Sequence, residues 1–97
     1  MAGTVIVFYR YNWNESFYQL SEEERKGLVA KLEEGRDKVG AKLIVHCHSR
    51  WASEQWRGFG VEEYPSLEAL QEFSKWQEEM NLFRYMTSET MLGSKRE

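Results

Sequence analysis

The segment over residues 4–11 constrains the fold of this chain more than any other. It is a run of β-branched and aromatic residues, which predicts a β-strand. Successive side chains of a strand point to opposite faces of the sheet. One face carries Val7 and Tyr9, and the other carries Ile6 and Phe8. Because both faces are apolar, this strand needs a cover on each side of its sheet.

Two helices and three further strands follow in the sequence. Ser21 and Glu24 have the spacing of a capping box, which predicts that a helix begins there. Pro65-Ser66 predicts the start of a second helix, with Ser66 as its N-cap. The predicted elements are a helix over 21–40, strands over 41–51 and 56–64, a helix over 66–80 and a strand over 83–92.

The element order β-α-β-β-α-β is that of a ferredoxin-like α+β fold, with a four-stranded antiparallel sheet and both helices on one face. We expect residues 1–97 to form a single domain of this kind. Two helices leave one face of the sheet bare. A second copy of the chain would cover that apolar face, so we predict a homodimer that packs sheet against sheet.

Composition excludes several classes of partner. The formal net charge is −3 and no basic cluster stands out, which argues against nucleic acid. No apolar run approaches the roughly 20 residues of a membrane span, and no charged leader precedes the first strand. Cys47 is the one cysteine, which is typical of a reducing compartment. We therefore expect a cytoplasmic protein.

The predicted strand over 41–51 carries the two histidines of the chain, His46 and His48. Strand alternation places both imidazoles on one face, together with Ile44 and Arg50. Two groups that exchange protons near neutral pH thus point into one small volume. By the same alternation, the opposite face carries Leu43, Val45 and Cys47.

The histidine pair is the first candidate site. A neutral imidazole is a general base near pH 7, so His46 or His48 is a candidate for proton transfer, and Arg50 for holding an oxygen of the substrate. Two other roles remain open. The imidazoles could be hydrogen-bonded within a subunit interface, or they could bind a metal ion with a third ligand from Glu62, Glu63 or Glu89. We expect no organic cofactor.

Aromatic side chains form a second candidate site. Tyr9 and Tyr11 share a strand face, and Trp51 and Trp56 flank the predicted hairpin turn. An aromatic-lined cavity with a few polar groups suits a flat organic ligand. Packing between subunits is the alternative use of these side chains.

Two glycines lie on one face of the strand over 56–64. At Gly58 and Gly60 the missing side chains leave room for a ligand or a neighbouring backbone, or they mark a bulge. A third glycine and a directly following helix are absent, so this is no dinucleotide-binding motif.

The segment 63–70, Glu-Tyr-Pro-Ser-Leu-Glu-Ala-Leu, resembles the strand-to-helix junction of the dimeric α+β barrel superfamily. That group includes cofactor-free monooxygenases, muconolactone isomerases, haem-degrading enzymes and aldoxime dehydratases. The resemblance implies a ferredoxin-like subunit that pairs into a dimeric α/β barrel, with a small-molecule cavity beside the sheet. It favours an enzyme that isomerises, cyclises or oxygenates a small organic substrate. The alternatives are a non-catalytic binding or assembly module, or a metal or haem protein that uses His46 and His48.

Overall fold

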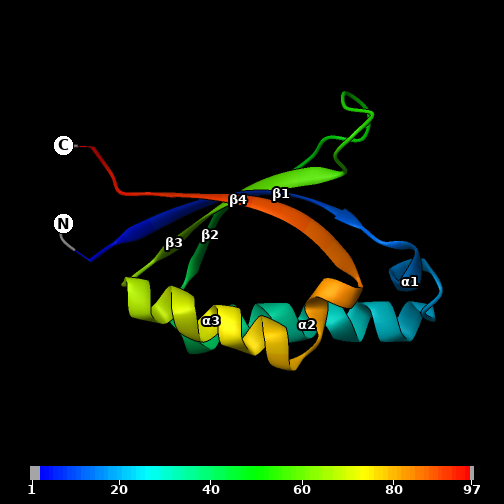
Figure 1. Cartoon of the computed structure of the whole chain (residues 1–97), viewed down its shortest axis with the longest axis horizontal. Coiled ribbons are helices and arrows are strands. Elements are labelled where there is room, and N and C mark those ends of the chain that lie inside the picture. Colours follow the sequence, from blue (N-terminus) through cyan, green and yellow to red (C-terminus); the bar gives the residue numbers. More distant parts are fainter. Residues whose placement is uncertain (1–2, 97) are drawn as a thin grey trace.

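The computed structural model describes residues 3–96 and shows a four-stranded antiparallel sheet with both long helices on one face (Figure 1). The strand order is β2-β3-β1-β4, so the doubly apolar strand β1 is central, with a neighbour on each side. This confirms the ferredoxin-like α+β fold. The elements are β1 (Val5–Trp13), α1 (Glu15–Tyr18), α2 (Glu22–Lys38), β2 (Lys42–His48), β3 (Gly58–Tyr64), α3 (Leu67–Glu79), the 3-10 helix η1 (Leu82–Arg84) and β4 (Met86–Gly93).

Both helices begin at the predicted caps. The Ser21 hydroxyl accepts a hydrogen bond from the Glu24 amide at 3.1 Å, and the Glu24 carboxylate accepts one from the Ser21 amide at 2.9 Å. At the start of α3, the Ser66 hydroxyl accepts a hydrogen bond from the Ala69 amide at 3.0 Å. These bonds satisfy amides that have no partner inside the helix, and they fix where each helix enters the fold.

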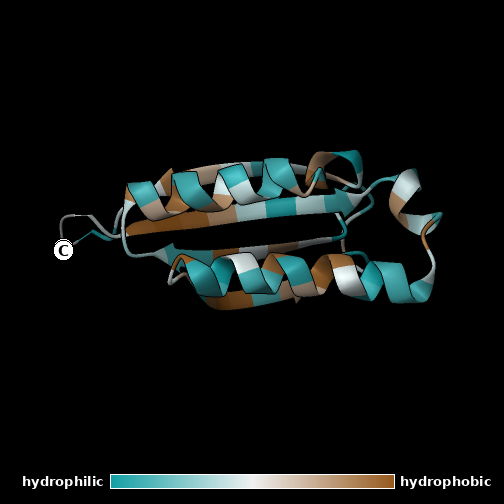
Figure 2. Cartoon of the chain, turned by 90° about the horizontal axis from the view of Figure 1, so that it is seen from below, coloured by the Kyte–Doolittle hydropathy of each residue, from teal (hydrophilic) through white to brown (hydrophobic). Residues whose placement is uncertain are grey.

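The core lies between the helices and the sheet. Its buried side chains come from strands, helices and η1: Val7, Leu32, Tyr64, Phe73 and Leu82. Seen from the helix side, α2 and α3 run along the two borders of the sheet, with strands visible between them (Figure 2).

The segment before the first long helix and the start of the last strand differ from the prediction. Residues 12–20 were expected to be a connection, but β1 continues to Trp13 and α1 follows. Phe17 of α1 is buried and stacks on Trp13 with ring centroids 3.9 Å apart, so burial of these two rings orders the segment. The last strand begins at Met86 instead of residue 83, because Leu82 is fully buried in the core as part of η1.

The second strand is shorter than predicted and contains a β-bulge. Leu43 pairs with Glu62 and Val45 pairs with Val61, which leaves Ile44 without a partner on β3. The extra residue reverses the alternation before Val45. Leu43 therefore lies on the histidine face of β2, and the prediction that it lies on the opposite face is wrong.

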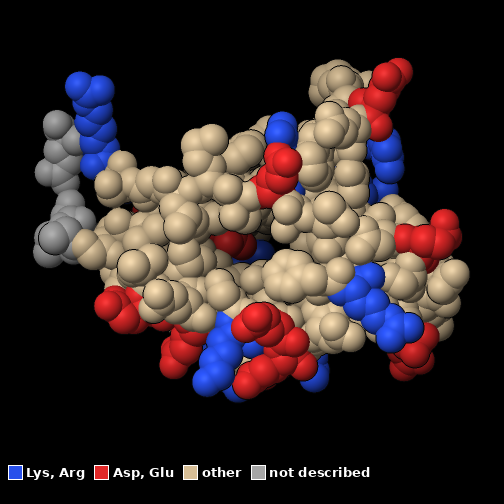
Figure 3. Space-filling model, viewed as in Figure 1, with Lys and Arg blue, Asp and Glu red and all other residues tan. Residues whose placement is uncertain are grey.

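The face of the sheet away from the helices, called the open face here, carries apolar side chains from all four strands. Phe8, Val45 and Met91 are exposed, and Met91 is 69% exposed. Figure 3 shows charged side chains gathered along the helix side of the molecule and fewer over the sheet. This confirms that β1 is apolar on the side that the helices do not reach.

Candidate functional site

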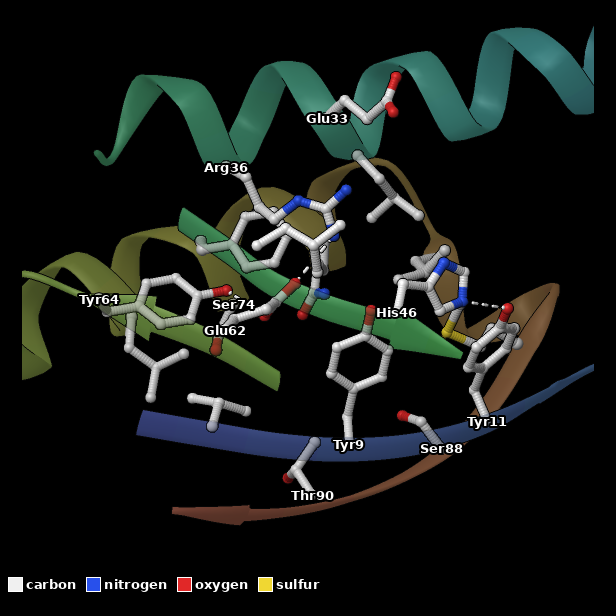
Figure 4. Close-up of a pocket in the computed structure, with 18 of the residues that line it drawn as sticks. Tyr9, Tyr11, Glu33, Arg36, His46, Glu62, Tyr64, Ser74, Ser88 and Thr90 are labelled. Carbon is white, nitrogen blue, oxygen red and sulfur yellow. Dashed lines mark hydrogen bonds and ion pairs between the residues drawn. The ribbon is translucent and has the colours of Figure 1, made fainter. Parts of the chain in front are cut away.

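A cavity of about 490 Å³ lies between the helix-facing side of the sheet and the two long helices (Figure 4). Its volume is within the range of small-molecule sites. Val7, Leu32 and Phe73 are among the side chains that form its apolar walls. The polar side chains that line it are Tyr9, Tyr11, Glu33, Arg36, His46, Glu62, Tyr64, Ser74, Gln77, Ser88 and Thr90. An apolar cavity with a few converging polar groups is the usual form of a ligand site.

One end of the cavity carries an imidazole bonded to a phenol. His46 Nε2 and the Tyr11 hydroxyl lie 2.8 Å apart and share a hydrogen bond, whose direction depends on the imidazole tautomer. Burial, with help from the charges of His48 and Arg36, lowers the pKa of His46 below its ordinary value of 6.5. Burial also raises the pKa of Tyr11. At pH 7 the pair therefore consists of a neutral imidazole and a protonated phenol.

The other end holds a buried ion pair. Arg36 Nη1 lies 2.8 Å from Glu62 Oε2, and the two side chains are 17% and 6% exposed. The Tyr64 hydroxyl donates a hydrogen bond to Glu62 Oε1 at 2.7 Å. Burial raises the pKa of Tyr64, and the charge of Glu62 raises it further, so this phenol stays protonated. We call Arg36, Glu62 and Tyr64 the Arg36 cluster.

Tyr9 lies between the Arg36 cluster and His46 (Figure 4). Tyr9 pairs with Gly60 across β1 and β3, and its ring lies over that glycine, where a Cβ atom would stand 2.5 Å from the phenol oxygen. Burial raises the pKa of Tyr9 to about 12, with a smaller contribution from the charge of Glu62. The space at Gly60, which the sequence left open to a ligand or a backbone, is thus filled by an aromatic ring of the same chain.

Of the residues that the sequence singled out, Tyr9, Tyr11 and His46 line the cavity. His48 lies on the same face of β2, with its ring centroid 5.7 Å from that of His46. Arg50 does not share a strand face with the histidines as predicted, because β2 ends at His48 and Arg50 is exposed in the turn that follows.

The two tryptophans are not among the residues that line the cavity. Trp51 is 86% exposed, and its indole donates a hydrogen bond to the His48 carbonyl at 3.1 Å. The Arg10 guanidinium lies over the Trp56 ring, 4.7 Å from its centroid. Arg10 pairs with Glu89 across β1 and β4, which places this group on the open face.

Sequence reasoning missed Arg36, the arginine that the cavity contains. A signal for it was available, since Arg36 is four residues after Leu32 and thus lies on the apolar stripe of α2. A charged residue on a buried stripe needs a partner inside the protein. Glu62, one of the three strand carboxylates considered, is that partner, because it occupies the buried face of β3.

In the part of the chain that the structure describes, the histidine pair has no third metal ligand beside it. Within residues 3–96 no group of three His, Cys, Asp or Glu side chains is arranged to hold a metal ion. Among the same residues, no helix is both long and apolar enough to cross a membrane.

No family model and no curated protein matches the sequence. The fold, in contrast, matches solved structures. Chlorite dismutase from Candidatus Nitrospira defluvii, as an arginine-to-lysine variant, superimposes with a TM-score of 0.74 at 19% identity, covering 98% of this chain and 41% of that chain. Its complex with imidazole gives 0.75 at 18% identity, covering 100% and 42%. A further chlorite dismutase-like chain gives 0.73 at 17% identity, covering 92% and 42%.

This chain has a chlorite dismutase-like fold. The likeness is one of fold, and this is the fold that the resemblance to the dimeric α+β barrel superfamily implies. The chain spans about two fifths of the length of the chlorite dismutase chains that it matches.

Proposed function

We propose that the chain binds a small organic molecule in the cavity and that His46 transfers a proton to or from it. One observation carries the proposal: an imidazole held by a phenol faces a cavity of ligand size between sheet and helices. The walls are apolar and aromatic, which suits a flat organic molecule.

The electrostatics of His46 support a role as a base. The lowered pKa leaves the imidazole neutral at pH 7 and able to accept a proton. The hydrogen bond between Nε2 and Tyr11 orients the imidazole ring. The other ring nitrogen, Nδ1, therefore points in a fixed direction. Arg36 takes the role of oxygen holder that the sequence assigned to Arg50, since Arg36 lines the cavity.

The substrate class is an enolisable or phenolic compound. Removal of a proton from carbon leaves an enolate, and return of the proton to a different carbon completes an isomerisation. Attack of the same enolate on dioxygen is the second outcome and would make the chain a cofactor-free oxygenase. Both begin with the step that we assign to His46.

Hydrogen–deuterium exchange tests the proton transfer without knowledge of the substrate. Phenylpyruvate and a panel of aromatic ketones are incubated with the protein in D₂O, and loss of the α-proton signal is followed by NMR. We expect the wild type to accelerate exchange in at least one compound, His46→Gln to abolish that acceleration, and His48→Gln to keep most of it. Equal rates in the wild type and His46→Gln would refute the role of His46.

A non-catalytic binding module is the first alternative, and it predicts binding without exchange. A haem protein is the second. His46 could ligate haem iron through Nδ1, whereas Nε2 would first have to be released from Tyr11. Titration with haemin measures this directly, and a Soret shift that depends on His46 would replace the proton-transfer proposal with a haem site.

We also propose that residues 1–97 act as one ferredoxin-like unit that pairs with a second copy through the open face. The exposed apolar side chains of Phe8, Val45 and Met91 support this, because a patch of this kind is unfavourable in water. The proposed compartment is the cytoplasm, on the evidence of the single Cys47.

A further inference from the structure

The Arg36 cluster is an unusual feature for so small a core. A buried ion pair gains little over well-packed apolar residues, because removing two charges from water offsets their attraction. Yet Arg36 and Glu62 are mostly buried beside the apolar walls of the cavity. Charged groups placed in a cavity at such a cost are frequently functional.

The cluster leaves hydrogen-bond donors free toward the cavity. A guanidinium carries five N–H groups. Arg36 donates to Glu62 through Nη1. Another donor is directed at the Tyr9 hydroxyl, and Arg36 and Tyr9 both line the cavity, so two bonds leave part of the guanidinium available to a ligand there.

Glu62 is fully engaged by its neighbours. One carboxylate oxygen accepts from Arg36 and the other from the Tyr64 hydroxyl. These two bonds hold the guanidinium in place and neutralise its charge. The cavity thus presents a fixed, planar set of N–H donors with no excess positive charge, which suits a monoanionic carboxylate better than a phosphate dianion.

Tyr9 adds a donor next to Arg36. Its hydroxyl is protonated at neutral pH and lies between the Arg36 cluster and His46. Along β3, Glu62 is two residues from Gly60, the partner of His46. Two strand residues span about 7 Å, so one aromatic ring with its substituents bridges the two ends of the cavity.

We propose that the Arg36 cluster and Tyr9 bind a carboxylate on the molecule that occupies the cavity, so that the other end of the same molecule reaches His46. This inference rests on the proposed function and narrows it to aromatic or similarly flat carboxylic acids. The apolar walls strengthen the charge-assisted hydrogen bonds because they exclude water from them.

Calorimetry with a matched pair of probes tests the proposal. The probes are 2-naphthoate and 2-naphthamide, which share a shape and differ in charge. We expect the wild type to bind naphthoate about tenfold more tightly than naphthamide, the effect of one charge-assisted bond. Arg36→Gln should abolish this preference. Tyr9→Phe, which deletes one hydroxyl, should reduce it and serves as a second variant if Arg36→Gln unfolds.

Glu62→Gln gives the sharpest test, because the two hypotheses predict opposite signs. The glutamine carbonyl oxygen still accepts from Arg36, and its NH₂ group can donate to the Tyr64 oxygen, but the competing negative charge is gone. A carboxylate site then binds naphthoate more tightly, whereas a purely structural cluster binds it less tightly. Arg10→Gln, which breaks the ion pair with Glu89 on the open face, is the control and should change neither affinity.

The failures of the two proposals are distinguishable. Equal binding of the two probes, or a naphthoate preference that survives in Arg36→Gln, would overturn the carboxylate site and leave the cavity as a ligand site. Tighter binding of 2-naphthyl phosphate than of naphthoate would also overturn it. Binding of no probe at millimolar concentration would refute the ligand cavity itself.

Discussion

The Tyr11 hydroxyl lies 2.8 Å from His46 Nε2, although the two residues belong to strands that are not neighbours. Strand β3 runs between them. The bond is possible because β3 carries Gly58 and Gly60 at this level, and the Tyr11 ring lies over Gly58, where a Cβ atom would stand 3.1 Å from it. The two glycines therefore let tyrosines of β1 reach across a whole strand.

The protonation of His46 gives the first prediction. In a ring-proton NMR titration, we expect its midpoint below 6.5, because burial and the charges of His48 and Arg36 disfavour the imidazolium, while Glu62 opposes them. His48→Gln should raise the midpoint, and Glu62→Gln should lower it. A His46 midpoint above 6.5 would contradict the assignment of a neutral base.

Stability should depend on pH through the same group. The folded pKa of His46 is below the unfolded value, so the unfolded chain binds the proton first. The contribution of neutral His46 to the free energy of unfolding is complete above pH 6.5 and falls as the pH drops toward the folded midpoint. Urea unfolding at pH 7.5 and 5.5 measures this, and His46→Gln should lose less stability between the two values than the wild type.

Gly60→Ala should damage the site more than the fold. The added Cβ would stand 2.5 Å from the Tyr9 oxygen, so the ring must move. Because the group that must move is the Tyr9 side chain and not the backbone, we expect the loss in free energy of unfolding to stay in the overpacking range of about 1–3 kcal/mol. We expect a melting temperature a few degrees lower and loss of the naphthoate preference. Gly27→Ala, at a position with no atom within 4 Å, is the matched control.

The buried carboxylate gives a stability prediction. Glu62→Leu leaves Arg36 and Tyr64 without their acceptor and should lower the free energy of unfolding by about 3 kcal/mol, as for other broken buried pairs. Glu89→Gln breaks an exposed pair and should change it by less than about 1 kcal/mol. Urea denaturation of both variants measures the two free energies of unfolding. Similar losses in the two variants would mean that the buried cluster contributes no more to stability than the exposed pair.

The open face gives a prediction about assembly. If two copies pair through it, sedimentation at micromolar concentration should show a dimer, and Met91→Lys should produce a monomer because it places a charge among apolar side chains. Glu33→Lys, on the helix side, should leave the dimer intact. A wild-type monomer that stays folded at high dilution would refute the pairing.

Local signals predicted the fold well. The capping residues Ser21 and Ser66 act over three or four residues, so a sequence reveals them directly. The site was predicted only in part. Alternation along a strand predicts the shared face of Tyr9 and Tyr11 on β1 and the inward direction of His46 on β2. The apolar stripe of α2 signals that Arg36 is buried, but its pairing with Glu62 depends on how α2 packs over the sheet, which no local pattern encodes.

The bulge at Ile44 has a consequence for comparisons between sequences. Removing that residue would leave Leu43 opposite Glu62 and His46 two places further along the strand, still opposite Gly60. Val45 is the other residue between Leu43 and His46, and removing it would change the side chain that β2 places opposite Val61. Alignments of proteins with this fold should therefore allow a one-residue gap at Ile44, the point where the length of the chain can vary without moving the imidazole.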